Sequence, residues 1–384
     1  MGLVVSRQLL LVQQGSDQIC EDFVNPGPDN RNQRSGKNKN NLKTKKNQTN
    51  NLAGKQSPSA SSGSEKPNSK KPDCKKPDSK KLSSRKPGNR ELSDKGKRGA
   101  QKLGVWLAQK TLEPDIVLCT RSPVARVTAE KLVKAMGADT RLIKEVDLSA
   151  NGELVWKKIA RAIPRKAKRV MVVGGKTEVK GVLSRLLGDS GAKKAALKSA
   201  SLAIVSGLSG WSARSSDEIN LKKVIHSKKL PDGFPYPHPD GAERRLRPAY
   251  YYRQSSVIPY RIENGRVQIL LVASSSMKHW VVPKGIHEPG LSSAESAAME
   301  ALEEAGIEGE VHKKALGHYE YNKWGGRCRV VVYAIKVESI IPEKKWQESH
   351  RGRRWCLPED ATRMVRQREL IGMIRKLVAK VTSR

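Results

Sequence analysis

Apolar residues occur in a run at the start of the chain and recur from about 92 to 212, in runs that predict alternating strands and helices. The opening MGLVVSRQLLLV has the apolar core of a first strand. Short apolar runs predict buried strands, and amphipathic runs predict helices: PDIVLCT and RVMVVGG are of the first kind, and KRGAQKLGVWLAQKT, VARVTAEKLVKAMG and VKGVLSRLLG of the second. SASLAIVSGLSGW predicts a further strand or hairpin. Strands that alternate with helices favour an α/β domain with a parallel sheet.

A second pattern begins at Tyr250. Strands are expected near SVIPYR, RVQILLVA and WVV, and then in GHYEY and RCRVVVYAIKV. A helix is expected between the third and fourth of these strands, and RELIGMIRKLVAKV predicts a closing helix. We therefore expect a second α/β domain over 250–384. Residues 213–249 are charged and contain DGFPYPHPDG, a composition typical of a linker.

Composition changes the picture near the amino end, because no aromatic residue occurs between Phe23 and Trp106. The segment is rich in Asn, Ser, Lys and Pro, and it contains the imperfect repeat SKKPDCKKPDSKK. Such a segment cannot bury enough apolar surface to offset its chain entropy. We predict a disordered basic insert over 24–90, which divides the first domain into 1–23 and 91–212.

Charge and cysteine usage narrow the class of partner. The formal net charge of +36 over 384 residues points to anionic partners, namely polyphosphates, nucleotides or, through the basic insert, nucleic acid. The five cysteines stand alone without a CxxC pair, which argues for a cytoplasmic protein and against a zinc or disulfide framework. No apolar run is long enough to cross a bilayer, so a membrane partner is not expected.

The stretch KGIHEPGLSSAESAAMEALEEAGI concentrates carboxylates at helical spacing. Ser292 and Glu295 form the pattern of a capping box, and Gly306 stands where a helix commonly ends. Between these ends, carboxylates at i, i+3 and i+4 project from one face: Glu300, Glu303 and Glu304. Hard oxygen ligands grouped in this way suit Mg²⁺ or Mn²⁺. An exposed acidic stripe is the alternative interpretation.

The other side of this helix is predicted to lie close to a sheet. Small and apolar residues fall roughly opposite the carboxylates: Ala294, Ala298, Ala301, Leu302 and Ala305. Small side chains allow a helix to approach a sheet closely.

The flanks of the acidic helix resemble the Nudix box, whose pattern is G-x5-E-x7-R-E-U-x-E-E-x-G-U with U apolar. Residues that match at the right spacing are Gly285, Glu300, Ala301, Glu303, Glu304, Gly306 and Ile307. Leu291 replaces the first glutamate, and Met299 replaces an arginine that helps to orient a neighbouring carboxylate in the family. The resemblance implies an α/β/α sandwich with a mixed sheet. It also implies Mg²⁺ or Mn²⁺ held by Glu300, Glu303 and Glu304, with the Gly285 carbonyl as a further ligand.

The resemblance extends over roughly 250–381. ILLVASSSMKHWVVPKGIHEPG, GHYEYNKWGGRC and RGRRWCLPEDA look most like the diphosphoinositol polyphosphate and diadenosine polyphosphate branch of the Nudix hydrolases. By position, the resemblance implies phosphate contacts from Arg253, Ser274, Ser275, Ser276, Lys278 and Lys284. A basic rim could add Arg327, Arg329, Arg351, Arg353 and Arg354. Tyr250, Tyr251, Tyr252 and Trp324 either stack on a base or pack against the sheet.

The first domain resembles the SixA-type histidine phosphatases in LLLVQQG and in VMVVGGKTEVKGVLSRLLG. That family uses a nucleophilic histidine, flanking arginines and a second histidine. Here Gln13 and Gln14 stand where arginine and histidine should be, and Gly175 replaces the second histidine. Ungapped alignment puts Val124 at the second arginine. We therefore expect a degenerate domain, a pseudophosphatase.

Two function hypotheses follow. The first is a metal-dependent Nudix pyrophosphohydrolase that cleaves a phosphoanhydride in a nucleotide polyphosphate, such as a dinucleoside polyphosphate or a nucleoside triphosphate. Glu300, Glu303 and Glu304 would carry the catalysis, one of them orienting or deprotonating the attacking water. The second is a basic protein that binds nucleic acid or polyphosphate and whose Nudix scaffold is weakened at Leu291 and Met299.

Overall fold

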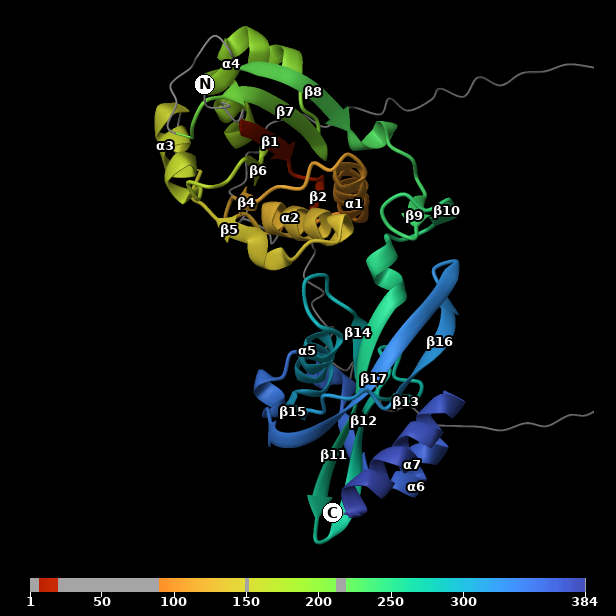
Figure 1. The fold of residues 1–384 in the computed structure, drawn as a ribbon. Helices are drawn as coiled ribbons and strands as arrows, with labels where there is room; N and C mark the ends of the chain where they lie inside the picture. Colours follow the sequence, from red (N-terminus) through yellow and green to blue (C-terminus); the bar gives the residue numbers. More distant parts are fainter. Residues whose placement is uncertain (1–6, 20–89, 149–151, 212–218, 384) are drawn as a thin grey trace, which may run out of the picture. The chain divides into compact units, whose positions relative to one another are not determined.

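The computed structural model describes residues 7–19, 90–148, 152–211 and 219–383 (Figure 1). The expected insert, 24–90, lies outside these ranges except for Arg90. The described residues build one six-stranded sheet, one eight-stranded sheet and two small two-stranded sheets. No helix in this part of the chain combines the length and the apolar character that a bilayer crossing needs.

The six-stranded sheet forms from residues 7–226. Its strands, in spatial order, are β5 (Ile143–Glu145), β4 (Ile116–Cys119), β6 (Arg169–Gly174), β1 (Arg7–Gln13), β7 (Ser201–Leu208) and β8 (Asn220–His226). Neighbours from β5 to β1 run parallel, as the alternation of strands and helices predicted. β7 and β8 join antiparallel, so that the complete sheet is mixed.

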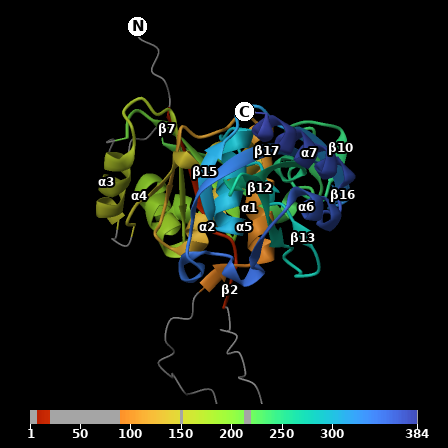
Figure 2. The ribbon, with the colours of Figure 1, turned by 90° about the horizontal axis from the view of Figure 1, so that it is seen from below.

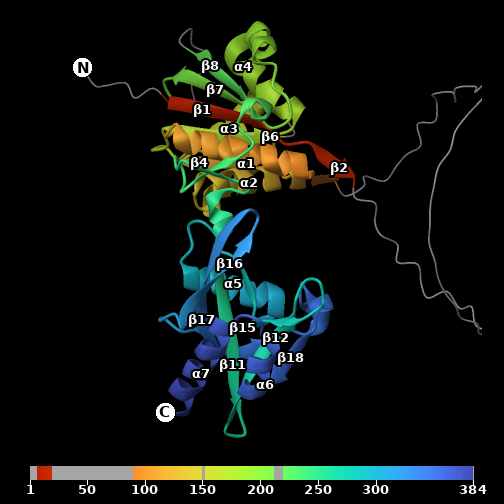
Figure 3. The same ribbon diagram turned by 90° about the vertical axis from the view of Figure 1, so that its right-hand side faces the viewer.

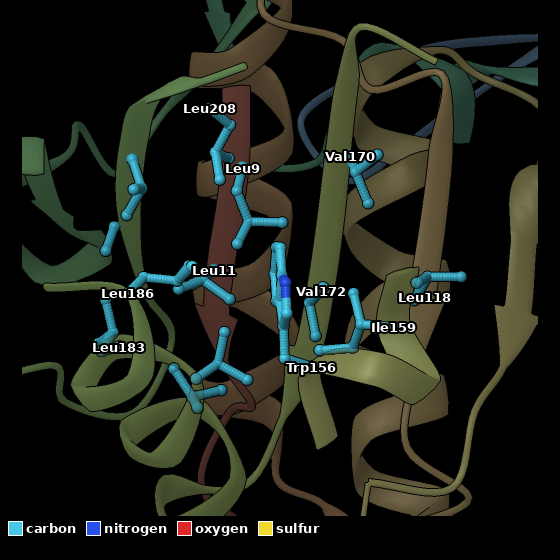
Figure 4. Packing of buried hydrophobic residues seen from close by; sticks show 14 of the residues in the cluster. Leu9, Leu11, Leu118, Trp156, Ile159, Val170, Val172, Leu183, Leu186 and Leu208 are labelled. Carbon is cyan, nitrogen blue, oxygen red and sulfur yellow. The ribbon is translucent and has the colours of Figure 1, made fainter. Parts of the chain in front are cut away.

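Helices cover both faces of this sheet, because its central strands are apolar on both sides. α1 (Asp94–Gln109) and α2 (Pro123–Met136) pack with Leu10 and Val12 of β1. α3 (Gly152–Ala162) and α4 (Lys176–Ala195) pack on the opposite face (Figure 2). Figure 4 shows this second core, where Trp156 of α3 lies between the Leu9 and Leu11 strand and Val172, and Ile159 lies beside Val172.

Part of the expected linker belongs to the first sheet. β8 lies within 213–249 and pairs with β7. The same range contains β9 (Phe234–Tyr236) and β10 (Glu243–Arg245), which form a hairpin. The periodicity of β8 is hidden in the sequence, because most of its residues are exposed or half-exposed. The remaining small elements up to residue 252 are β2 (Asp17–Ile19), β3 (Arg90–Leu92), the 3₁₀ turns η1 (Thr140–Leu142) and η2 (Ser227–Lys229), and η3 (Ala249–Tyr252).

The eight-stranded sheet forms from residues 253–356 and is mixed. Its main path is β13 (Trp280–Val281), β12 (Arg266–Ala273), β11 (Arg253–Glu263), β17 (Gly326–Ile340) and β15 (Ile307–Val311). Three further strands attach to this path: β14 (Lys284–Ile286) to β11, β16 (Gly317–Lys323) to β17, and β18 (Arg353–Cys356) to β12. β11 and β17 are parallel, and the other pairs are antiparallel.

Helices lie on both faces of the second sheet as well (Figures 1 and 3). α5 (Ser293–Ala305) packs on Val257, Leu270 and Val272. α6 (Pro358–Met364) and α7 (Arg368–Thr382) cover the other face, where Ile374 and Leu377 are fully buried. The turns η4 (Glu343–Lys345) and η5 (Ser349–Arg351) precede β18. The prediction of an α/β protein whose second half is a helix–sheet–helix sandwich with a mixed sheet is confirmed.

Candidate active site

The acidic helix α5 begins and ends at the residues that the sequence indicated. The Ser292 hydroxyl accepts from the backbone N–H of Glu295, and the Glu295 carboxylate accepts from the backbone N–H of Ser292, which completes the capping box. Gly306 ends the helix with φ of 59°, in the left-handed region that glycine adopts readily. Both ends of the helix are therefore fixed by local sequence signals.

Alanines position α5 against the sheet, although partly different ones from those predicted. Ala297, Ala301 and Ala305 are fully buried at spacing i, i+4, i+8. Leu302 was expected on this face, but 37% of its surface is exposed. That expectation was wrong, because the row of closest approach runs through every fourth residue and Leu302 falls one position outside it.

Gly285 on β14 lies directly against the Glu300 carboxylate. A Cβ at position 285 would overlap the carboxyl group of Glu300. Glycine is therefore required for close approach between this strand and the acidic face of α5. Gly285 and Glu300, 15 positions apart in the sequence, form one wall of the site.

Glu304 is held from two sides. Its Oε2 accepts the backbone N–H of Lys284 at 2.9 Å, and its Oε1 lies 2.6 Å from Nη1 of Arg351. Only 17% of the Glu304 side chain and 5% of the Arg351 side chain are exposed. The carboxylate therefore has a fixed orientation.

Burial and neighbouring negative charges raise the pKa values of the other two carboxyl groups. Burial, followed by the charges of Glu304 and Glu303, raises the pKa of Glu300 to about 8. Burial and the charges of Glu288 and Glu348 raise the pKa of Glu303 above its ordinary value. Negative potential therefore accumulates on this face of α5, which would favour a bound cation.

A divalent cation fits the donor set of this face, even though the side chains are not closed around one. Among the described residues, no three His, Cys, Asp or Glu groups are gathered as a ready-made metal cluster. Glu300 and Glu303 nevertheless offer hard oxygens from adjacent turns of α5, and the absence of a Cβ at Gly285 lets the Glu300 carboxylate lie against the backbone of β14. The chemistry of these donors therefore suits a small oxygen-liganded ion, such as Mg²⁺ or Mn²⁺.

Lys284 is the predicted phosphate contact that lies nearest to the acids. Its backbone binds Glu304, and its ammonium lies 5.4 Å from the centroid of the Tyr321 ring. Burial lowers the pKa of Lys284, whereas the charges of Glu304 and Glu300 oppose this effect. Positive charge thus stands directly beside the carboxylates.

The other predicted phosphate contacts lie on strand ends and in one loop. Ser275, Ser276 and Lys278 are exposed in the loop between β12 and β13. Arg253 begins β11 and is the register partner of Arg329 on β17. Arg327 is exposed at the start of β17, where Nη1 donates to Glu320 Oε2 at 3.3 Å.

Arg353 has a different role from the one predicted. Nη1 donates to the carbonyls of Ala305 and Gly306 at 2.9 and 3.0 Å, and Nη2 donates to that of Ile341 at 2.7 Å. The guanidinium thereby satisfies carbonyls at the carboxyl end of α5. We assign Arg353 to the helix end rather than to a phosphate rim.

The aromatic residues form a packed group. Tyr251 and Trp324 meet edge to face with ring centroids 5.2 Å apart. The Tyr252 hydroxyl donates to the Trp324 carbonyl at 2.8 Å, and Tyr252 is 1% exposed. For Tyr252 the structure favours packing over stacking on a base.

Two charged residues near the acids were not selected by sequence reasoning. Glu348 raises the pKa of Glu303 and pairs with Arg351 at 2.8 Å. The charge of Lys323, at the end of β16, helps to lower the pKa of Lys284. Neither residue lies in the Nudix box. The sequence offered one clue, for Lys323 alone, because the Gly325–Gly326 pair that follows it indicates a hairpin turn.

In the first domain, the positions aligned with a phosphatase site meet at one edge of the sheet. The backbone N–H of Gln14 donates to the Gly174 carbonyl at 2.8 Å, and Gly175 caps α4. Gln13 and Gly174 are register partners at the carboxyl ends of β1 and β6. The first histidine in the chain, His226, is on β8.

Comparison with known proteins identifies the second domain. A family model for the NUDIX domain matches residues 252–376. Diphosphoinositol polyphosphate phosphohydrolase 3-beta of Bos taurus is 31% identical over 126 residues, which cover 32% of this chain and 74% of that protein. The chain therefore belongs to the Nudix family, and it is a hydrolase that acts on phosphoanhydride bonds. The corresponding expectation from the sequence is confirmed.

Other similarities are more distant. The asymmetrical bis(5'-nucleosyl)-tetraphosphatase of Sus scrofa is 27% identical, over 30% of this chain and 82% of that protein. A crystal structure assigned to the phosphohistidine phosphatase SixA of Agrobacterium tumefaciens covers 57% of this chain and 97% of its own, at 15% identity and a TM-score of 0.34. That likeness is too low to support an argument about the first domain.

Proposed function

We propose that this protein is a metal-dependent pyrophosphohydrolase of nucleotide polyphosphates, with the site on α5. One observation carries the proposal: Glu300, Glu303 and Glu304 share a helix face, and the missing side chain of Gly285 lets the Glu300 carboxylate lie directly against the backbone of β14. Similarity to a dinucleoside tetraphosphatase and to a diphosphoinositol polyphosphate phosphohydrolase supports a polyphosphate substrate.

Each acid has a separate task in this proposal. Glu304 is held by the Lys284 amide and the Arg351 guanidinium, so its carboxylate would meet the metal in a fixed orientation. Glu303, which is exposed, supplies oxygen ligands, and Glu300 acts as a ligand or orients the attacking water. When bound, the cation would supply positive charge that stabilises the developing negative charge on the phosphates.

Substrate phosphates would be drawn to the cationic groups beside the acids. Lys284 is the principal candidate, with Lys323 nearby and the exposed loop at Ser275, Ser276 and Lys278. A polyphosphate carries several negative charges, so several weak contacts together can fix its orientation. Arg253 and Arg327 lie on strand ends of the same sheet and complete the proposed set.

The first domain is proposed to be catalytically inactive. A phosphoenzyme needs a nucleophile, and Gln13 and Gln14 have amide side chains at the matched positions. The expected result is that full-length protein shows no phosphohistidine phosphatase activity with or without Mg²⁺. Activity that persists after Glu303→Gln would overturn this part of the proposal.

A substrate panel tests the hydrolase proposal. Full-length protein would be incubated with dinucleoside polyphosphates, ADP-ribose and oxidised nucleoside triphosphates in the presence of Mg²⁺. We expect turnover of at least one substrate and a loss of about 100-fold or more in E303Q, because the substitution removes a proposed metal ligand. The variant should remain folded, since the side chain of Glu303 is exposed. E310Q, which neutralises an exposed acid on β15, is the matched control. Absence of turnover on every substrate, or equal rates in E303Q and E310Q, would contradict the proposal.

A further inference from the structure

Arg351 is an unusual residue for its surroundings. Within the described part of the chain, it is the only charged residue that is buried, with 4% of its surface exposed. A guanidinium withdrawn from water is stable only where ion pairs and hydrogen bonds replace its hydration. The burial of Arg351 must therefore be explained by the ion pairs and hydrogen bonds that its guanidinium makes.

Those partners connect three elements. Nη1 lies 2.6 Å from Glu304 on α5 and 2.8 Å from Glu348, and Nε donates to the Ala273 carbonyl at the end of β12 at 2.8 Å. Arg351 itself is the last residue of η5. One side chain thus ties η5 and β12 to an acid of the proposed metal face.

The helix offers no positive charge of its own. α5 has the sequence SAESAAMEALEEA, which contains neither lysine nor arginine, and Met299 is 42% exposed. The positive groups that hold Glu304 come from outside the helix, namely the N–H of Lys284 and the guanidinium of Arg351. With one donor on each oxygen, the carboxylate cannot rotate without losing a bond.

We propose that Arg351 is the positioning residue of this site: its buried ion pair with Glu304, shared with Glu348, sets the carboxylate orientation that metal binding requires. In this way η5 supplies the guanidinium that the helix lacks at Met299. The inference rests on the proposed function and adds to it a residue that acts through Glu304. Arg351, which the sequence placed on a phosphate rim, is thereby moved to the support of the acids.

Metal binding separates this role from a merely structural one. Mn²⁺ affinity of the full-length protein would be measured by calorimetry, together with kcat, KM and thermal unfolding. In R351M we expect Mn²⁺ affinity to fall by about tenfold or more and kcat to fall with it, because supporting contacts to metal ligands typically have effects of this size. The substrate KM should change little, and R351K should fall between wild type and R351M, since a lysine can pair with Glu304 but cannot also reach Ala273 and Glu348.

R353M is the matched control, because it removes a guanidinium at the same end of α5 that binds carbonyls. It should lower the melting temperature and leave Mn²⁺ affinity at the wild-type value. A folded R351M with wild-type Mn²⁺ affinity and kcat would overturn the inference. If R351M does not fold, R351K with wild-type values would do the same. Wild-type protein without Glu303-dependent Mn²⁺ uptake would instead overturn the proposed function.

Discussion

At the scale of single residues, burial changes the protonation of Glu300, which we propose as a metal ligand. The group is withdrawn from water against Gly285, next to Glu303 and Glu304, and its pKa rises to about 8. In the metal-free folded state it therefore keeps a proton at pH values where the unfolded chain, with a pKa of 4.5, has lost it. The stability that this proton contributes to the folded state is fully present below about pH 4.5 and is lost as the pH rises through about 8.

This linkage predicts a pH dependence of the metal-free protein. The melting temperature should fall by several degrees between pH 5 and pH 8, since each pKa unit corresponds to roughly 1.4 kcal/mol before screening. E300Q should flatten this part of the profile, and E310Q should retain the wild-type slope. Equal slopes in wild type and E300Q, measured by calorimetry in a chelating buffer, would contradict the assignment.

Added metal should reverse the trend, because a cation competes with the proton on Glu300. At saturating Mn²⁺, the gain in melting temperature should be larger at pH 8 than at pH 6. The comparison is made on wild type and E303Q, which should gain less at both pH values. A gain that is independent of pH would show that Glu300 is not part of the metal site.

At the scale of elements, the site depends on how closely β14 and α5 approach. Sequence periodicity predicted α5, its capping box and the long strands β11, β12 and β17, because their apolar spacing and their caps are local signals. β14, β15 and β18 contain only three to five residues, and their pairing partners define them. The Arg351–Glu304 pair could not be predicted, since the two residues are far apart in sequence and meet only in the fold.

Gly285→Ala tests the close approach of these two elements. A methyl group would overlap the Glu300 carboxylate, so the strand or the acid must move. We expect kcat to fall by about 100-fold, since a displacement of about 1 Å has effects of this order in active sites. G372A is the control: α7 has open space at that position, and alanine should raise stability by up to about 1 kcal/mol. Wild-type kcat in G285A would refute the role given to this contact.

At the scale of the whole molecule, the basic composition and the hydrolase domain can be separated experimentally. β2 and β3 are paired, with Ile19 opposite Arg90, so the two chain segments that flank residues 20–89 are neighbours. A short Gly/Ser loop could therefore join them in place of that segment. The division of the chain into domains could be proposed from composition, but this pairing could not, because each strand has only three residues.

The replacement variant should keep the hydrolase activity of the full chain. Retention on immobilised RNA or DNA should decrease steeply with salt in the wild type and be lost in the variant, because counterion release drives such binding. E303Q serves as the reciprocal control and should retain nucleic-acid binding. Salt-sensitive retention that survives the replacement would assign the binding to the folded, basic remainder of the chain.

The contact between the Lys284 amide and Glu304 has a consequence for how this enzyme can diversify. A peptide N–H is common to all residues except proline, so a change of side chain at position 284 leaves the support of the acid in place. The Lys284 ammonium, which we propose as a phosphate contact, can thus be replaced without loss of the support that the backbone gives to Glu304. The contacts that select the substrate can therefore change, in evolution or by mutagenesis, without a change in the support of the acidic residues.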